Sequence, residues 1–261
     1  MIMAGAELGI YEAIGKEHFS AEQIAQKCNT NIHATEQLLN ALAGAGYIRY
    51  SDNRYSIPKK LQKWLLKDSE ANLIGKLRFQ ILEWNYLNHL ENFVRTGKAL
   101  DLHHTESLAS NGWELYQEAM RDLSVNASKE LAGKIPVPKG ATNMLDIGGS
   151  HGLYSIELCK KNEGLRSTIL ELPAAVESAA AIAKRYDPSG YVTYKAGNVL
   201  TDDLGEQQYD LVMINNVVHH FTVEQNEQLA IKIARSLKPG GIYVIGEMIR
   251  NDKPGKGSEE H

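Results

Sequence analysis

From Asn143 onward, short apolar segments alternate with amphipathic ones, and this alternation restricts the possible folds more than any other feature of the chain. The pattern predicts strands at 144–147, 166–170, 191–195, 210–214 and 241–247, and helices that include 174–185 and 223–237. Strands of this kind form a parallel sheet with helices on both faces. Ligands of such sheets bind at the carboxyl ends of the strands, so the residues after each strand are candidate site residues.

Two further regions precede this one. The stiff segment Pro136–Gly140 predicts one boundary. A second is predicted at residue 67, where short helices and a hairpin give way to an all-helical region. Together they divide the chain into 1–67, 68–140 and 141–261. In the first region, Ser20 and Gln23 predict a capping box, Asn31 is a candidate cap for the next helix, and Gly44 and Gly46 are placed to end it. A hairpin is predicted over 47–57, and an earlier helical stripe is formed by Ala4, Leu8, Tyr11 and Ile14.

Two helices and a two-stranded wing are typical of a winged-helix domain, which often binds DNA. Residues 1–60 carry six Lys or Arg and six Asp or Glu side chains, and the second helix has no cation. DNA affinity depends mainly on neutralising phosphates, so this composition favours a dimerisation role over nucleic-acid binding.

Residues 68–134 are predicted to be helical. One apolar stripe, interpreted first as core and second as a ligand-facing surface, comprises Leu73, Leu77, Ile81, Trp84 and Leu87. A second stripe, on a helix from about Gly112 to Gly133, comprises Trp113, Tyr116, Met120 and Leu123.

Composition restricts where the protein works. The net charge is −4, and the two cysteines are too few for a disulfide framework, which fits a reducing compartment. No apolar run is long enough to span a bilayer, and the N-terminus lacks the features of a signal peptide. We therefore expect a cytoplasmic protein that does not bind a membrane.

The first strand is followed by a glycine-rich turn, Gly148-Gly149-Ser150-His151-Gly152. Glycines allow a ligand to approach the backbone closely, but the spacing differs from that of a dinucleotide fingerprint. Asp146 would repel a pyrophosphate and suits a cationic group, such as the ammonium of an amino acid. The alternative is a tight strand–helix turn without a ligand.

The next strands end in further polar residues. Glu171 is placed to accept hydrogen bonds from both ribose hydroxyls, although a solvated surface acid remains an alternative. Asn198 offers an acceptor to an adenine amino group, and Val199 an apolar contact to its ring. His219 and His220 follow the fourth strand, where catalytic groups collect. Adjacent histidines rarely bind one ion, so no metal site is predicted.

Together, these motifs resemble S-adenosylmethionine-dependent O-methyltransferases that carry an N-terminal winged-helix dimerisation domain, the type that includes plant phenolic and bacterial natural-product enzymes. The resemblance covers nearly the whole chain and is most specific over Leu145–Gly152, Asn216–Phe221 and Leu237–Gly241. It implies a class I, Rossmann-like α/β fold, S-adenosylmethionine as cofactor, a small hydroxylated aromatic acceptor, and a homodimer.

The resemblance also implies roles for particular residues. His219 matches the general base and Glu247 a carboxylate beside it. The cofactor-binding residues would be Asp146, Gly148, Gly149, Gly152, Glu171, Leu172, Asn198, Val199, Asn215 and Ser124. The acceptor pocket would include Trp84, Tyr116 and Met120.

The chain departs from the family pattern at Ser150, where a glycine is usual, at Asn198, where an aspartate is usual, and at His220, where plant relatives carry Asp. The family pattern also continues past the fifth strand with a helix and two more strands, whereas this sequence has a polar segment, 251–261. Two alternatives therefore stay open: a relative that binds the cofactor without methylating, and a non-catalytic dimeric or DNA-binding module.

Overall fold

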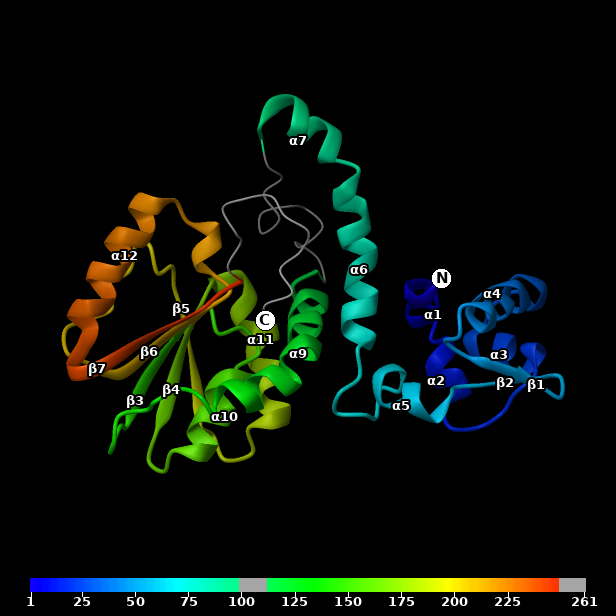
Figure 1. The fold of residues 1–261 in the computed structure, drawn as a ribbon, viewed down its shortest axis with the longest axis horizontal. Coiled ribbons are helices and arrows are strands. Elements are labelled where there is room, and N and C mark those ends of the chain that lie inside the picture. The colour runs from blue at the N-terminus through cyan, green and yellow to red at the C-terminus, as the bar shows by residue number, and fades with distance from the viewer. Residues whose placement is uncertain (99–111, 249–261) are drawn as a thin grey trace. The chain divides into compact units, whose positions relative to one another are not determined.

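The computed structural model describes residues 1–98 and 112–248 (Figure 1). The polar segment 251–261 lies outside the described residues. The chain forms two compact units, Met1–Lys129 and Glu130–His261, which we describe separately. The division falls inside the helix Gly112–Leu131, whereas the boundaries predicted at 67 and 140 remain predictions.

The N-terminal unit begins with short helices and a hairpin. These elements are α1 (Ile2–Glu7), α2 (Ile10–Ile14), α3 (Ala21–Cys28), α4 (Ile32–Gly44), β1 (Arg49–Ser51), β2 (Arg54–Ser56) and α5 (Lys59–Leu65). Both predicted helix starts are confirmed. The Ser20 hydroxyl accepts from the Gln23 N–H in a capping box, and the Asn31 side chain accepts from the Ala34 N–H. The hairpin is antiparallel and pairs Tyr50 with Tyr55, as predicted but with shorter strands.

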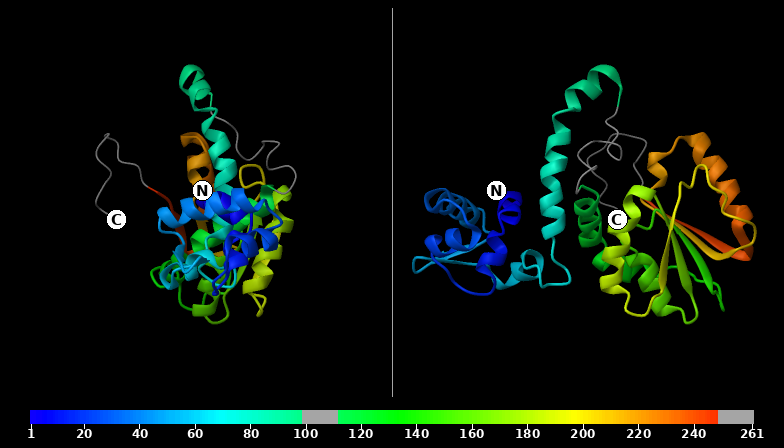
Figure 2. Two further views of the ribbon diagram at one scale, coloured as in Figure 1. Left: turned by 90° about the vertical axis from the view of Figure 1, so that its right-hand side faces the viewer. Right: turned by 180° about the vertical axis from the view of Figure 1, so that it is seen from behind.

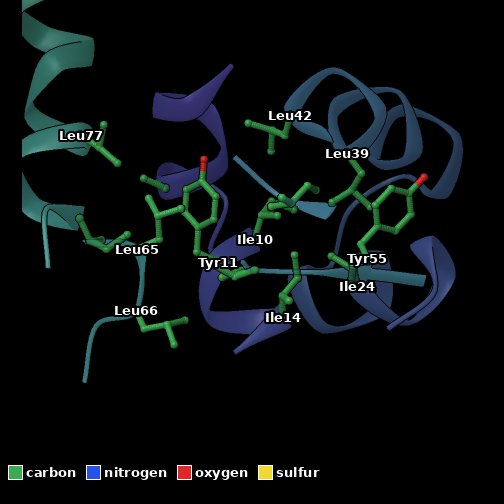
Figure 3. Close-up of a cluster of buried hydrophobic side chains, with 14 residues drawn as sticks. Ile10, Tyr11, Ile14, Ile24, Leu39, Leu42, Tyr55, Leu65, Leu66 and Leu77 are labelled. Carbon is green, nitrogen blue, oxygen red and sulfur yellow. The ribbon is translucent and has the colours of Figure 1, made fainter. Parts of the chain in front are cut away.

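A single apolar core joins these elements (Figure 3). Its members include Ile10, Tyr11, Ile14, Ile24, Leu39, Leu42, Tyr55, Leu65, Leu66 and Leu77. The predicted apolar stripe includes Leu8, but that side chain is exposed, so the prediction is wrong there. The reason is Gly9, whose left-handed backbone (φ +70°) separates α1 from α2 and turns Leu8 out of the buried face.

Three further helices follow among the described residues: α6 (Ile74–Leu87), α7 (Leu90–Thr96) and α9 (Gly112–Leu131), of which the last crosses into the second unit. The buried residues of α6 are Ile74, Leu77 and Phe79, all in its first two turns. Trp84 and Leu87 are 63% and 59% exposed, so interpreting the whole stripe as core is wrong for the second half of α6. Phe79 packs against Ala119 of α9, and Leu82 is partly buried against the same two residues, whereas Trp84 and Leu87 are exposed.

The buried face of α9 carries many polar residues beside apolar ones such as Ala119 and Val125. Leu123 of the predicted stripe is half-exposed, whereas Arg121 and Asp122 are buried. The Lys76 N–H donates to Asp122 Oδ2 at 2.9 Å, and Arg121 pairs with Oδ1 at 2.8 Å. Burial raises the pKa of Asp122 to about 6, against the opposing effects of Arg121 and of the backbone N–H groups. This carboxylate therefore fixes the start of α6 against α9 by hydrogen bonds that an apolar pattern does not reveal.

The second unit is an α/β layer structure, as predicted. Its elements are β3 (Asn143–Ile147), α10 (Leu153–Lys161), β4 (Arg166–Glu171), α11 (Pro173–Tyr186), β5 (Val192–Ala196), β6 (Tyr209–Asn215), η1 (Val218–His220), α12 (Val223–Ser236) and β7 (Leu237–Gly246). All five strands pair in parallel, in the order β5-β4-β3-β6-β7. The chain leaves β3 in one direction and returns to its other side at β6, which creates a topological switch point between these strands.

Two apolar layers hold the helices on this sheet. One contains Leu145, Ile147, Val212, Ile214, Leu229 and Ile233 and lies beneath α12. The other contains Met144, Leu158, Cys159, Leu211 and Met213 and lies beneath α10. Figure 2 shows α12 on one side of the sheet and α10 and α11 on the other. None of the described helices is long and apolar enough to cross a membrane.

Two helical glycines test the packing of the N-terminal unit. A Cβ on Gly5 would lie 2.8 Å from the Tyr11 hydroxyl oxygen and 2.9 Å from its ring, whereas a Cβ on Gly44 would meet nothing within 4 Å. We expect Gly5→Ala to lower the free energy of unfolding by about 1–3 kcal/mol, because Tyr11 is fully buried and cannot move away. Gly44→Ala should leave stability unchanged or raise it by about 0.5–1 kcal/mol. Urea denaturation of both variants measures the difference, and equal effects would contradict it.

Candidate active site

The loop after β3 is rich in glycine, so mainly backbone atoms of this loop lie at the carboxyl end of the sheet. Gly148, Ser150 and Gly152 have φ of +66°, +52° and +76°. The Gly148 N–H donates to the Leu170 carbonyl at 2.8 Å, which ties the loop to β4. A Cβ on Gly148 would lie 2.8 Å from Val217 and one on Gly152 would lie 2.9 Å from Ile169. Glycine is therefore required at both positions, by conformation and by space.

Asp146 lies beneath this loop and is 1% exposed. Its Oδ2 accepts from the Ser155 hydroxyl at 2.7 Å, and that hydroxyl is also 2.8 Å from the Ser167 hydroxyl. Within the described part of the chain, Oδ1 is buried without a hydrogen-bond partner. Gly149 passes so close that a Cβ there would collide with the carboxylate. The geometry leaves one carboxylate oxygen to be satisfied by a ligand.

The environment of Asp146 favours a cationic ligand. Burial raises the pKa of this carboxyl to about 7, the Ser155 hydrogen bond acts against the rise, and the charge of Glu171 adds to it. A positive group placed here would relieve both the burial and the repulsion between the two acids. The buried carboxylate beneath a close-approach loop thus fits the ammonium of an amino-acid moiety.

Glu171 ends β4 and is 8% exposed, so the alternative of a solvated surface acid is wrong. Its Oε2 accepts from the Ser150 N–H at 3.1 Å and its Oε1 from the Leu172 N–H at 2.8 Å. Burial raises the pKa of this carboxyl against those two hydrogen bonds. Each oxygen keeps acceptor capacity, so the carboxylate can receive a pair of hydroxyls while the backbone holds it in place.

The sequence analysis missed Tyr194 as a residue that supports the glycine-rich loop, and it gave no role to His151 within that loop. The Tyr194 hydroxyl donates to the Ser150 carbonyl at 2.7 Å, and burial raises its pKa. His151 is buried and accepts the Leu153 N–H on Nδ1 at 3.1 Å. Both hydrogen bonds help to fix the conformation of the glycine-rich loop. Tyr194 lies inside a strand, where an aromatic residue is indistinguishable by pattern from an ordinary core residue.

The loop after β5 is the third element at this end of the sheet. Asn198 is exposed, and its Oδ1 accepts from the Leu200 N–H at 3.0 Å. Val199 is buried and packs with Leu170 and Leu204. The predicted acceptor oxygen of Asn198 is therefore already engaged within its own loop, with one lone pair remaining. Its contact to adenine stays a prediction.

His219 and Glu247 come from the two strand ends on the other side of the switch point. His219 lies in η1, after β6, and Glu247 directly follows β7, which pairs with β6. The His219 Nδ1 and the Glu247 Oε2 are 2.9 Å apart. Because an ionised carboxylate only accepts, Nδ1–H donates in this pair, and Nε2 keeps a free lone pair.

Their surroundings keep this pair polar and accessible. The side chain of His219 is 50% exposed and that of Glu247 is 17% exposed. Burial acts to raise the pKa of Glu247, but the His219 hydrogen bond and the Met248 N–H outweigh it, so the pKa lies below its usual value. The His220 ring centroid is 4.0 Å from that of His219. Among the described residues, no group of three His, Cys, Asp or Glu side chains is arranged to bind a metal ion.

Asn215 marks the end of β6. Its side-chain oxygen lies so close to Gly246 that a Cβ there would collide with it. The next residue, Asn216, has φ +53° and donates its N–H to the Gly246 carbonyl at 2.7 Å. These contacts fix the direction in which the chain leaves β6 towards His219.

The remaining predicted residues belong to the N-terminal unit. Ser124 is buried and donates to the Met120 carbonyl at 2.7 Å. The Tyr116 ring packs edge-on against Phe79, with centroids 5.5 Å apart, and Trp84 is exposed. The predicted roles of Ser124, Trp84, Tyr116 and Met120 remain predictions.

Comparison with known proteins agrees with this geometry. Residues 145–243 match a family model described as a methyltransferase domain. The chain is 23% identical over 256 residues to a 3-hydroxy-5-methyl-1-naphthoate 3-O-methyltransferase of Streptomyces sahachiroi, a match covering 96% of this chain and 74% of that one. The chain is therefore similar to this O-methyltransferase over nearly its whole length, and its second unit is similar to methyltransferase domains.

Two solved structures show the same fold. One is an O-methyltransferase family protein from Burkholderia thailandensis (TM-score 0.81, 21% identity, covering 96% of this chain and 76% of that chain). The other is human N-acetylserotonin methyltransferase in complex with S-adenosylmethionine (TM-score 0.81, 18% identity, covering 94% and 74%). The human structure contains S-adenosylmethionine. The orphaned oxygen of Asp146 and the glycine cradle above it fit the charge and shape of that molecule.

The pKa of Asp146 predicts a pH dependence of stability. The folded chain holds this proton up to about pH 7, whereas an unfolded aspartate releases it near 3.8. Since the folded state binds more protons between these values, stability should fall as pH rises from about 4 to 7, by on the order of 4 kcal/mol. We expect Asp146→Asn to reduce this slope, with a smaller slope left by Asp122 and Glu171, whose pKa values burial also raises, and to be more stable than the parent chain at pH 8.

Urea denaturation from pH 4 to 8 measures this effect. Asp203→Asn is the matched control, because Asp203 is exposed and its pKa lies below the usual value, outside that window. An unchanged slope in Asp146→Asn would contradict the burial argument.

Proposed function

We propose that this chain transfers a methyl group from S-adenosylmethionine to a hydroxyl, most simply a phenolic one, of a small molecule. The observation that carries this proposal is the His219–Glu247 pair, which presents an imidazole with a free Nε2 at the end of the sheet where parallel-sheet proteins bind ligands. The relative from Streptomyces sahachiroi, whose name describes transfer to a naphthoate hydroxyl, supports a phenolic acceptor.

In this proposal the acidic strand ends hold the cofactor. Asp146, beneath Gly148, Gly149 and Gly152, receives the ammonium group, and Glu171 with Leu172 receives the ribose. Asn198 and Val199 contact the adenine, and Asn215 and Ser124 complete the cofactor-binding set. When bound, S-adenosylmethionine supplies a methyl group on a sulfonium that is already activated for displacement.

The task left to the protein is to align the acceptor and remove its proton. A phenol has a pKa near 10, so it is mostly protonated at neutral pH. His219 Nε2 accepts that proton as the acceptor oxygen bonds to the methyl carbon and the carbon–sulfur bond breaks. Glu247 holds Nδ1–H, which fixes the tautomer and stabilises the imidazolium that forms. In the proposal, Trp84, Tyr116 and Met120 line the acceptor pocket.

The base role predicts a specific loss of methylation. General-base catalysis contributes about 10²–10⁴-fold, so we expect His219→Gln to lose at least about 100-fold in kcat on a cognate phenol. Glu247→Gln should lose less, because it keeps the ring in place but removes the charge. His33→Gln is the matched control, since His33 is an exposed histidine in α4.

Methylation of a panel of phenols with labelled cofactor measures kcat, and calorimetry with S-adenosylhomocysteine measures binding. A loss below about fivefold in His219→Gln at saturating acceptor would exclude the histidine as base. Binding of S-adenosylhomocysteine without methylation of any acceptor would favour a relative that uses the cofactor differently.

We also infer that the N-terminal unit mediates a homodimer. Exposed apolar side chains are concentrated on α6 and α7, where Trp84, Leu87, Leu90, Phe93 and Val94 are all at least 45% exposed. The balanced charge of residues 1–60 argues against nucleic acid as the partner. Sedimentation equilibrium should give twice the chain mass, and Trp84→Glu with Val94→Glu should give a monomer. A monomeric parent chain at micromolar concentration would contradict this proposal.

A further inference from the structure

Lys232 of α12 makes an unusual set of contacts with the loop after β5. Its Nζ donates to three backbone carbonyls, those of Val199 at 2.7 Å, Leu200 at 3.1 Å and Asp202 at 2.9 Å. The three N–H bonds of the ammonium are therefore all used. Among the described residues no carboxylate forms an ion pair with Lys232, although its side chain is partly buried. A charge removed from water in this way requires such a complete set of partners.

The carbonyls converge because the loop is already folded back on itself. The Asp202 carboxylate accepts the Asn198 N–H at 3.1 Å, and Asn198 Oδ1 accepts the Leu200 N–H at 3.0 Å. The Thr201 and Asp202 N–H groups both donate to the Asn198 carbonyl. These bonds turn the remaining carbonyls of residues 199–202 towards α12. Without a cation there, three partly buried acceptors would lie together unpaired, which is unfavourable.

The same helix also holds the turn that carries His219. Asn226, in the second turn of α12, donates from Nδ2 to the Val218 carbonyl at 3.0 Å. Val218 begins η1, and His219 follows it. Asn226 and Lys232 thus attach two loops from different strand ends to one rigid element.

We propose that Lys232 is a positioning residue for the cofactor, whose ammonium holds the loop 198–202 in the conformation that receives the adenine. This inference rests on the proposed function, because that function assigns the adenine to Asn198 and Val199. Lys232 does not touch the adenine in this account. It acts through the three carbonyls, by charge-assisted hydrogen bonds that are roughly twice as strong as neutral ones.

The chemistry requires lysine rather than any cation. A tetrahedral ammonium can direct three donors to three carbonyls around one point, whereas the planar guanidinium of arginine spreads its donors along a fork. We therefore expect Lys232→Met to release the loop and Lys232→Arg to hold it only in part. Arg235→Ala is the matched control, because Arg235 is on the same helix and its exposed ion pair is with Asp203, directly after the loop.

The first measurement is amide hydrogen exchange of the full chain without ligand. Lys232→Met should raise exchange at residues 198–202 by about tenfold or more relative to the parent, while amides of β3 and β4 keep their protection. Arg235→Ala should leave exchange at 198–202 unchanged. Unchanged exchange of this loop in Lys232→Met would overturn the proposal, whether or not the chain binds a cofactor.

The second measurement is calorimetry with S-adenosylhomocysteine and with its analogue in which hypoxanthine replaces adenine. Lys232→Met should bind S-adenosylhomocysteine about tenfold or more weakly and lose most of the parent's preference for adenine, since a small misplacement of a binding group is costly. A folded Lys232→Met with unchanged affinity and preference would overturn the proposal.

A purely structural role would weaken both ligands equally, and that result would also overturn the proposal. If Lys232→Met does not fold, Lys232→Arg provides the same readouts, with intermediate values expected. A parent chain that binds neither ligand would refute the proposed function, and the exchange measurement would still decide whether Lys232 holds the loop.

Discussion

Two buried carboxylates at neighbouring strand ends are the constraint on which the rest of the site depends. β3 and β4 pair in parallel, so Asp146 and Glu171 reach the same edge of the sheet, and the Glu171 charge adds to the rise in the Asp146 pKa. The surrounding loop stabilises these acids with Ser155, with the Ser150 N–H and with the Leu172 N–H, but it leaves Oδ1 of Asp146 without a partner among the described groups. A site with this balance favours a ligand that has a cationic group at one end and hydroxyls beside it, and S-adenosylmethionine has both.

Parallel topology explains how such distant segments form one site. The chain runs outward from β3 to β5 and then returns to β6, so loops that follow β3, β4, β5, β6 and β7 all open at one edge. The acids gather on one side of the switch point and the His219–Glu247 pair on the other. This division separates the groups suited to binding the cofactor from the groups suited to moving a proton.

Much of the fold could be predicted because its signals are local. The Ser20 and Asn31 caps, the hairpin and the five strands each follow from a few adjacent residues, and the structure confirms them. The prediction that the whole apolar stripe of α6 is buried failed for its second half. The spacing of apolar residues shows which face of a helix is suited to packing, but it does not show how far along the helix a packing partner extends. Tyr194, His151 and Lys232 escaped prediction because their partners are backbone carbonyls or N–H groups, which carry no residue-type signal.

The attachments of α12 have one further consequence. Because Asn226 and Lys232 belong to one helix, any movement of that helix displaces the loop 198–202 and the turn that carries His219 together. Under the proposed function, the loop assigned to the adenine and the proposed base would then keep their relative positions when α12 moves. Under that proposal, weaker packing of α12 on the sheet would impair nucleoside binding and proton acceptance together, rather than one of them alone.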